Sequence, residues 1–410
     1  MFFPGRAHAG SRVVHQQQLW SGLSVCGPNK WNKSDLVGCV SFELSNHDPL
    51  YDPNALNRRL SEIAENRFAI PNSNPDDLIE IECEELKIAI YFGFSSGGES
   101  FFSEQIRIRP NVSIDFKNGV TVEEAVQVAL VCTRFFSFSI ASPVVPKHTS
   151  VFPLADRRKS RQNWREFLLF VPFPKTDEVA QQTDPRDSAW FLESQEVRAQ
   201  LSESLKIWMD RRKAWEDVYE LIDKLLRFRP MISGDRLETA FKIVEKIPLG
   251  SHGDELWASK VDELETSFVE SEIATRFSER ERNRIINRIQ SLKEETGTML
   301  IERLFDHLKT SWPKGSCLSA WFYGNLREAW SKRGKTAHGR IIIDDKDEFT
   351  KLTFAAETFA IMLVACELNL GDDPVRSLCQ AKLMTYIHGH FHAQPPNICQ
   401  KYEKKFPKYA

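Results

Sequence analysis

The residues best suited to chemistry lie close together at Arg333 and His338, within the segment Trp330–Arg340, which reads WSKRGKTAHGR. A guanidinium binds anionic oxygens bidentately, and an imidazole transfers protons near neutral pH. The pair therefore suits chemistry at a phosphodiester. Residues five apart on an ideal helix are separated by about 140°, so the two side chains converge only if the helix breaks near Gly334 or Gly339.

The elements that must position this pair are predicted to be helical. From about residue 188 the apolar residues recur with a period of 3.6, and the helix that leads into Arg333 carries Leu318, Phe322 and Leu326 on one stripe. A helix is expected to start at Ser233, because serine caps helix N-termini and an apolar-periodic run follows from Leu237. The second half of the chain is therefore predicted to be a helical bundle.

The first half has the pattern of a half-buried antiparallel sheet. Strands are expected at 36–44, 78–83, 86–94, 105–116 and 164–171, and apolar and polar residues alternate within 105–116. An amphipathic helix is expected at 54–68, and a second at 121–140 that opens with a capping box from Thr121 to Glu124. The fold class is α+β multidomain, with a β-rich front and an all-α back.

These patterns divide the chain into five parts. They are an irregular N-terminal arm at 1–35, a β-rich domain at 36–180, a helical connector at 181–232, a helical domain at 233–386 and a C-terminal tail at 387–410.

Composition limits the function classes further. The 410 residues include 54 Lys+Arg and 57 Asp+Glu, a net charge of −3, so any contact with nucleic acid must be local. The longest apolar runs, such as Ile88–Phe94, are far shorter than the roughly 18–20 residues that cross a bilayer. Eight scattered Cys without a C-x-x-C pair indicate reduced thiols, and we expect a cytoplasmic protein without membrane contact.

Two other clusters favour structural roles. His388, His390 and His392 have no nearby Cys or carboxylate to complete a ligand set, so we expect no metal and no cofactor. The arginines between Arg276 and Arg288 are interspersed with Glu279 and Glu281, which favours a surface laced with ion pairs.

The motif Arg333-x-x-x-x-His338-Gly339 at the end of a long helix resembles the HEPN superfamily of helical nucleotide-binding and ribonuclease domains. More narrowly, the chain resembles the ApeA-like HEPN proteins of bacterial anti-phage defence. The strand 106–116, which carries Pro110, and the capped helix after it resemble the ApeA N-terminal domain. The two resemblances together cover about residues 36–386.

The resemblance implies a metal-independent endoribonuclease in which a 2′-hydroxyl attacks the adjacent phosphate of RNA, such as tRNA, and leaves a cyclic phosphate. Arg333 would stabilise the developing charge, His338 would act as acid or base, and Lys335 and Arg340 would contact the RNA. Family sites are composite, so a homodimer is implied. In abortive infection, a phage-derived trigger acting through the N-terminal domain would release cleavage.

Gly334 departs from the family pattern, in which Asn, Asp or His commonly follows the arginine. A second hypothesis is therefore a catalytically weak or inactive HEPN dimer that binds RNA or a nucleotide. A third is a structural adaptor in which Arg333 and His338 only cap a helix, because helix C-termini attract cations.

Overall fold

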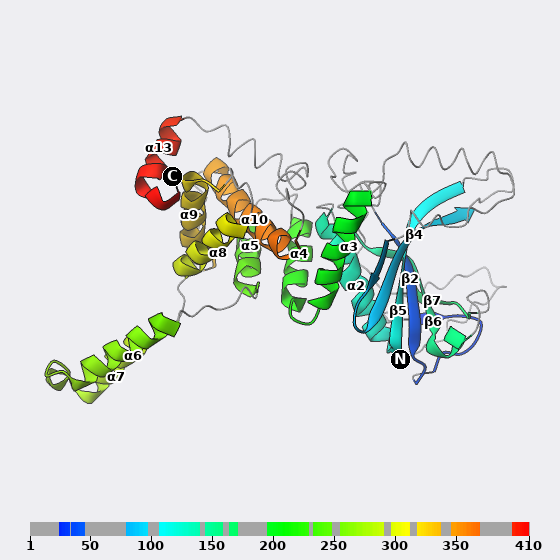
Figure 1. The fold of residues 1–410 in the computed structure, drawn as a ribbon, viewed down its shortest axis with the longest axis horizontal. Coiled ribbons are helices and arrows are strands. Elements are labelled where there is room, and N and C mark those ends of the chain that lie inside the picture. The colour runs from blue at the N-terminus through cyan, green and yellow to red at the C-terminus, as the bar shows by residue number, and fades with distance from the viewer. Residues whose placement is uncertain are drawn as a thin grey trace, which may run out of the picture. The chain divides into compact units, whose positions relative to one another are not determined.

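The computed structural model describes the chain as two compact units (Figure 1). The sheet unit spans Met1–Pro230 and Glu367–Tyr386, and the helical unit spans Met231–Cys366 and Ile387–Ala410. The described residues are 24–32, 34–45, 79–96, 106–139, 144–158, 164–170, 195–228, 233–247, 255–290, 297–311, 318–337, 346–369 and 396–409. The helix expected at 54–68 lies outside them.

The sheet unit contains an antiparallel sheet of seven strands in the order β1-β7-β6-β2-β5-β4-β3. The predicted α+β layout is thereby confirmed. The strands are β1 (Ser24–Cys26), β2 (Val37–Leu44), β3 (Ile79–Glu82), β4 (Leu86–Ser96), β5 (Ile106–Val120), β6 (Pro146–Pro153) and β7 (Phe167–Phe170).

Alternation accounts for the outer strand β3, where Ile79 and Ile81 are buried and Glu80 and Glu82 are exposed. Proline is normally excluded from a central strand because it cannot donate a ladder hydrogen bond. Pro110 is tolerated in β5 because pairing with β2 ends at Asn111, and Pro110 pairs only with Phe92 of β4.

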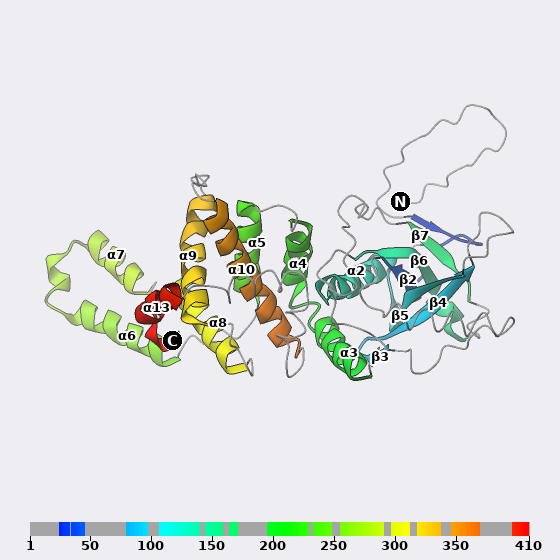
Figure 2. The same ribbon diagram turned by 90° about the horizontal axis from the view of Figure 1, so that it is seen from above.

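Helix α2 (Val122–Ser139) contacts β2, β5 and β6 and buries Phe135 and Phe136 (Figure 2). Its predicted capping box forms: the Glu124 amide donates to Thr121 Oγ1 over 3.2 Å, and the Thr121 amide donates to Glu124 Oε2 over 3.0 Å. The free thiols of Cys39, Cys83 and Cys132 are buried in this unit.

Helices α3 (Gln195–Asp210) and α4 (Glu216–Phe228) belong to the sheet unit and pack on α2, although both lie in the segment named as a connector. Trp208 joins the three helices. Its indole Nε1 donates to Val131 O over 2.9 Å, and its ring stacks on Tyr219 at 4.2 Å between centroids. This aromatic contact makes α3 and α4 part of the sheet unit's core.

In the helical unit, α9 (Ala320–Ala337) contacts α5 (Gly234–Lys246), α8 (Gly297–Ser311) and α13 (Pro396–Lys405). Ser233 caps α5 as predicted. The remaining described helices are α6 (Glu255–Glu270), α7 (Glu279–Gln290), α10 (Lys346–Glu367) and the short η6 (Ala274–Arg276) and η8 (Pro407–Tyr409). Because it contacts three other helices, α9 fixes the position of Arg333.

Helix α10 is the one described helix long and apolar enough to cross a membrane, but 72% of its apolar window is buried inside the protein. It also carries Glu357, which is 2% exposed and forms an ion pair with Arg236 of α5, 1% exposed. The second bond of the pair, from Arg236 Nη2 to Glu357 Oε2, is 2.6 Å long. A buried ion pair to a neighbouring helix is typical of the core helix of a folded domain.

The segment named as a C-terminal tail contributes α13 and η8, which pack on α9. Tyr409 is 4% exposed, and its hydroxyl donates to Asp306 over 3.0 Å. Gly324 of α9 makes this packing possible, because a Cβ there would lie 2.2 Å from Tyr402.

Gly324→Ala is therefore expected to lower the free energy of unfolding by about 1–3 kcal/mol, since overpacking forces α13 off α9. Denaturant unfolding of the full chain measures this loss. Ser331→Ala on an exposed position of the same helix is the matched control. Equal stability of the two variants would contradict the close approach of α13 to Gly324.

Candidate functional site

Arg333 lies near the C-terminal end of α9, which continues through Gly334 and ends at Ala337. The helix therefore does not break at Gly334, the first of the two positions considered. His338 and Arg340 lie outside the described residues, as does the side chain of Lys335. Their convergence with Arg333 stays a prediction, and His338 directly follows the helix end.

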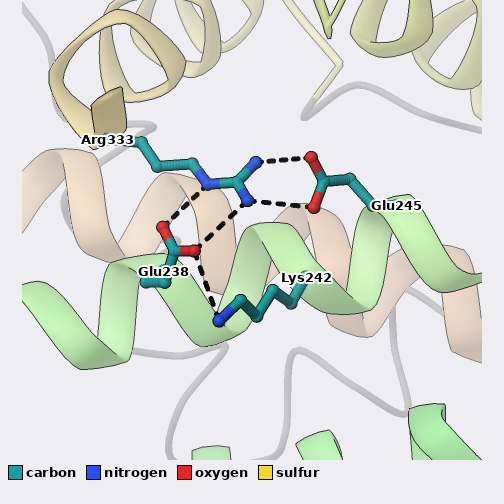
Figure 3. A network of polar contacts seen from close by, with 4 residues as sticks. All are labelled: Glu238, Lys242, Glu245 and Arg333. Carbon is teal, nitrogen blue, oxygen red and sulfur yellow. Dashed lines mark hydrogen bonds and ion pairs between the residues drawn. The ribbon is translucent and has the colours of Figure 1, made fainter. Parts of the chain in front are cut away.

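Two glutamates of α5 hold the Arg333 guanidinium (Figure 3). Glu238 accepts from Nε over 2.8 Å and from Nη2 over 3.3 Å. Glu245 accepts from Nη1 over 2.7 Å and from Nη2 over 2.9 Å. A guanidinium has two edges that bind an anion bidentately, and here both edges are occupied by carboxylates.

Two aromatic rings lie against this guanidinium. Its Cζ lies 4.7 Å from the ring centroid of Trp330 and 5.9 Å from that of Phe241. The two rings meet edge to face at 5.0 Å. Gly297 of α8 leaves room for them, because a Cβ there would lie 1.9 Å from the Trp330 ring. The Arg333 side chain is only 16% exposed and is held rigidly.

The carboxylates decide the electrostatics of this cluster. Burial alone would lower the pKa of Arg333, but the hydrogen bonds to Glu245 and Glu238 outweigh burial and raise it. The hydrogen bond from Arg333 lowers the pKa of Glu238 below its ordinary value of 4.5, against the opposing effect of burial. Lys242 adds to this effect with an ammonium 3.4 Å from Glu238 Oε1. These shifts keep Arg333 protonated and Glu238 ionised at neutral pH.

This lowered pKa predicts a pH dependence of stability. The Glu238 carboxylate stabilises the fold fully above the unfolded pKa of 4.5, and its contribution is lost as the pH falls through the lower folded pKa. Glu238→Gln is expected to cost about 1–2 kcal/mol of unfolding free energy at neutral pH and progressively less in acid. Denaturant unfolding over a pH series tests this, with the exposed Glu263→Gln as control; a cost independent of pH would contradict it.

Sequence reasoning found Arg333 but missed Glu238 and Glu245. They lie seven residues apart, hence two turns along one face of α5, and this spacing was the available signal. Nothing in the sequence indicates that this face meets α9, because the partners are 95 and 88 residues apart.

No group of three or more His, Cys, Asp or Glu side chains within the described ranges could hold a metal ion. His388, His390 and His392 lie outside those ranges. The carboxylates around Arg333 bind its guanidinium rather than a metal ion.

Residues 33–208 match the family model of ApeA N-terminal domain 1. The match covers β2 to β7, α2 and most of α3, and it runs beyond the expected domain end at residue 180. It supports an ApeA-like protein. No curated protein and no solved structure matches the chain.

Proposed function

We propose that this chain is a HEPN-type, metal-independent endoribonuclease of anti-phage defence, controlled by its sheet unit. The ApeA N-terminal match carries this proposal, because it occurs in one chain with an Arg333-x-x-x-x-His338 motif at the end of a core helix. A half-buried, preorganised arginine suits a reaction in which negative charge grows on a phosphate, and we predict that the His338 imidazole lies beside it.

In the proposed reaction a base takes the proton of the RNA 2′-hydroxyl, and its oxygen attacks the adjacent phosphorus. The bond from phosphorus to the 5′-oxygen then breaks, and that oxygen receives a proton. The products are a 2′,3′-cyclic phosphate and a 5′-hydroxyl. His338 supplies one of the two proton transfers, and Arg333 binds the non-bridging oxygens. Lys335 and Arg340 contact the RNA backbone.

Access of the phosphate to Arg333 requires that a carboxylate moves, because both bidentate edges are occupied. Glu245 is 36% exposed and Glu238 is 24% exposed, so Glu245 is the easier of the two to displace. Glu238 then keeps the guanidinium in position. A second copy of the chain would complete the site in a homodimer, and a phage-derived trigger would start the reaction.

His338→Ala separates this proposal from its alternatives. The variant is expected to lose RNA cleavage and the growth arrest that expression of the active chain causes, while it still binds RNA and unfolds at the wild-type denaturant concentration. A wild-type chain that binds RNA without cutting it would favour the binding dimer. A variant that changes stability alone would favour the structural adaptor.

A further inference from the structure

We propose that the exposed face of α7 is a binding site for the phosphate backbone of single-stranded RNA. The site consists of Arg280, Arg284 and Arg288, here called the arginine ladder. The inference rests on the proposed function for the identity of the polyanion as RNA.

Helix geometry puts the ladder on one face. Residues four apart advance about 40° around the axis and about 6 Å along it, so the three guanidinium groups form a row about 12 Å long. All three side chains are exposed, as are Asn283 and Asn287 beside them. A row of cations with amides beside it is suited to an extended phosphodiester backbone.

Within the described part of the chain, neither acidic residue of α7 forms an ion pair with Arg280 or Arg284. The Glu281 carboxylate accepts from the Ser278 amide over 2.9 Å and from the Ser278 hydroxyl over 2.7 Å, so it caps the helix start. These hydrogen bonds lower the pKa of Glu281 and keep it ionised at the cap. Among the described residues Arg280 and Arg284 have no ion-pair partner, so the ion-paired surface expected from the sequence is not found there.

Helix α6, which lies beside α7, carries five carboxylates and one lysine (Figures 1 and 2). Its exposed Glu263 and Glu270 lie about 160–180° around the helix from the buried Val261, hence on the outer side of α6. The half-buried Ile285 and Ile289 of α7 lie away from the ladder. Glu263 and Glu270 therefore lie away from the buried side of α6, whereas the half-buried Glu265 lies about 40° from Val261 on that side.

The same arrangement disfavours a protein partner for the ladder. Protein interfaces have an apolar centre, whereas the exposed residues of this face are Arg, Asn and the capping Glu281. The exposed apolar side chains of this region lie on α6 and in the turn after it, namely Leu264, Val269, Ile273 and Phe277.

The test measures binding of a fluorescent single-stranded RNA to the full chain by anisotropy at several salt concentrations. All proteins carry His338→Ala so that cleavage does not interfere. Arg280→Gln/Arg284→Gln is compared with Lys260→Gln/Arg282→Gln, which removes the same charge from other exposed positions of the hairpin. Arg282 lies about 160° around α7 from each of its two neighbours in the ladder.

The ladder variant is expected to bind about tenfold more weakly at physiological salt, with a log–log salt slope smaller by about 1.4, since each contact contributes about 0.7 on single strands. The control should bind within about twofold of its parent. Equal losses in both variants, or none in the ladder variant, would overturn the site. A changed sedimentation coefficient of the ladder variant with unchanged RNA affinity would also overturn the site, because it would identify a protein contact. If the ladder variant binds RNA more weakly but the wild-type chain does not cut RNA, the result would support the arginine ladder and reject the nuclease activity.

Discussion

Arg333→Ala is expected to lower the rate of RNA cleavage by about 10²–10³-fold, the usual effect of removing one preorganised donor from a developing oxyanion. The same change removes four hydrogen bonds, leaves Glu245 without its cation and leaves Glu238 with Lys242 alone. Stability should therefore fall as well, by about 1–3 kcal/mol. A loss of cleavage in this variant alone would not separate chemistry from folding.

A triple variant separates the two effects. Glu238→Gln/Glu245→Gln/Arg333→Ala removes the unpaired charges together with the arginine, so its stability is expected to return toward wild type while cleavage stays lost. Initial rates on labelled RNA and denaturant unfolding give the two readouts. Recovery of cleavage along with stability would show that Arg333 only supports the fold.

The largest stability effect is expected at the buried ion pair of the helical unit. Glu357→Ala should lower the free energy of unfolding by about 3–5 kcal/mol, because Arg236 would keep its charge in the core without the Glu357 carboxylate. Denaturant unfolding at neutral pH measures the loss. Glu302→Ala, which removes an exposed partner of Lys408, should cost less than about 1 kcal/mol.

Arg236→Met/Glu357→Leu is the companion variant. Replacement of a buried ion pair by apolar side chains is often neutral or stabilising, so the double variant is expected to regain most of the loss. A Glu357→Ala chain as stable as the Glu302→Ala control would contradict the buried pairing of α5 with α10.

Local features of the sheet unit were predictable because their signals are local. The Thr121–Glu124 box depends on residues three apart, and β3 follows strict alternation. Strand β6 was missed because prolines flank it, and His148 within it has a φ of 47°. Strand β1 was missed because only three residues pair with β7 in a segment read as irregular. Both strands are specified by their neighbours in the sheet.

The candidate site was only half predictable for the same reason. The local sequence shows an arginine at position 333 near the end of a helix. Glu238 and Glu245, in contrast, contact it only after α5 packs on α9. Charge counting along α7 likewise could not show that Glu281 is committed to Ser278 rather than to an arginine. Contacts between distant segments decide which charges remain available for a ligand.

The chemistry of the RNA ends is the measurement that tests the central claim most directly. Wild-type chain and the His338→Ala variant are incubated with tRNA and total bacterial RNA in excess EDTA, and the fragments are analysed for terminal groups. We predict 2′,3′-cyclic phosphate and 5′-hydroxyl ends with the wild type alone. If the wild type does not cleave RNA, the Gly334→Asn variant is assayed in parallel and is expected to restore cleavage. Fragments with 5′-phosphate ends, cleavage abolished by EDTA, or cleavage retained by His338→Ala would contradict the account.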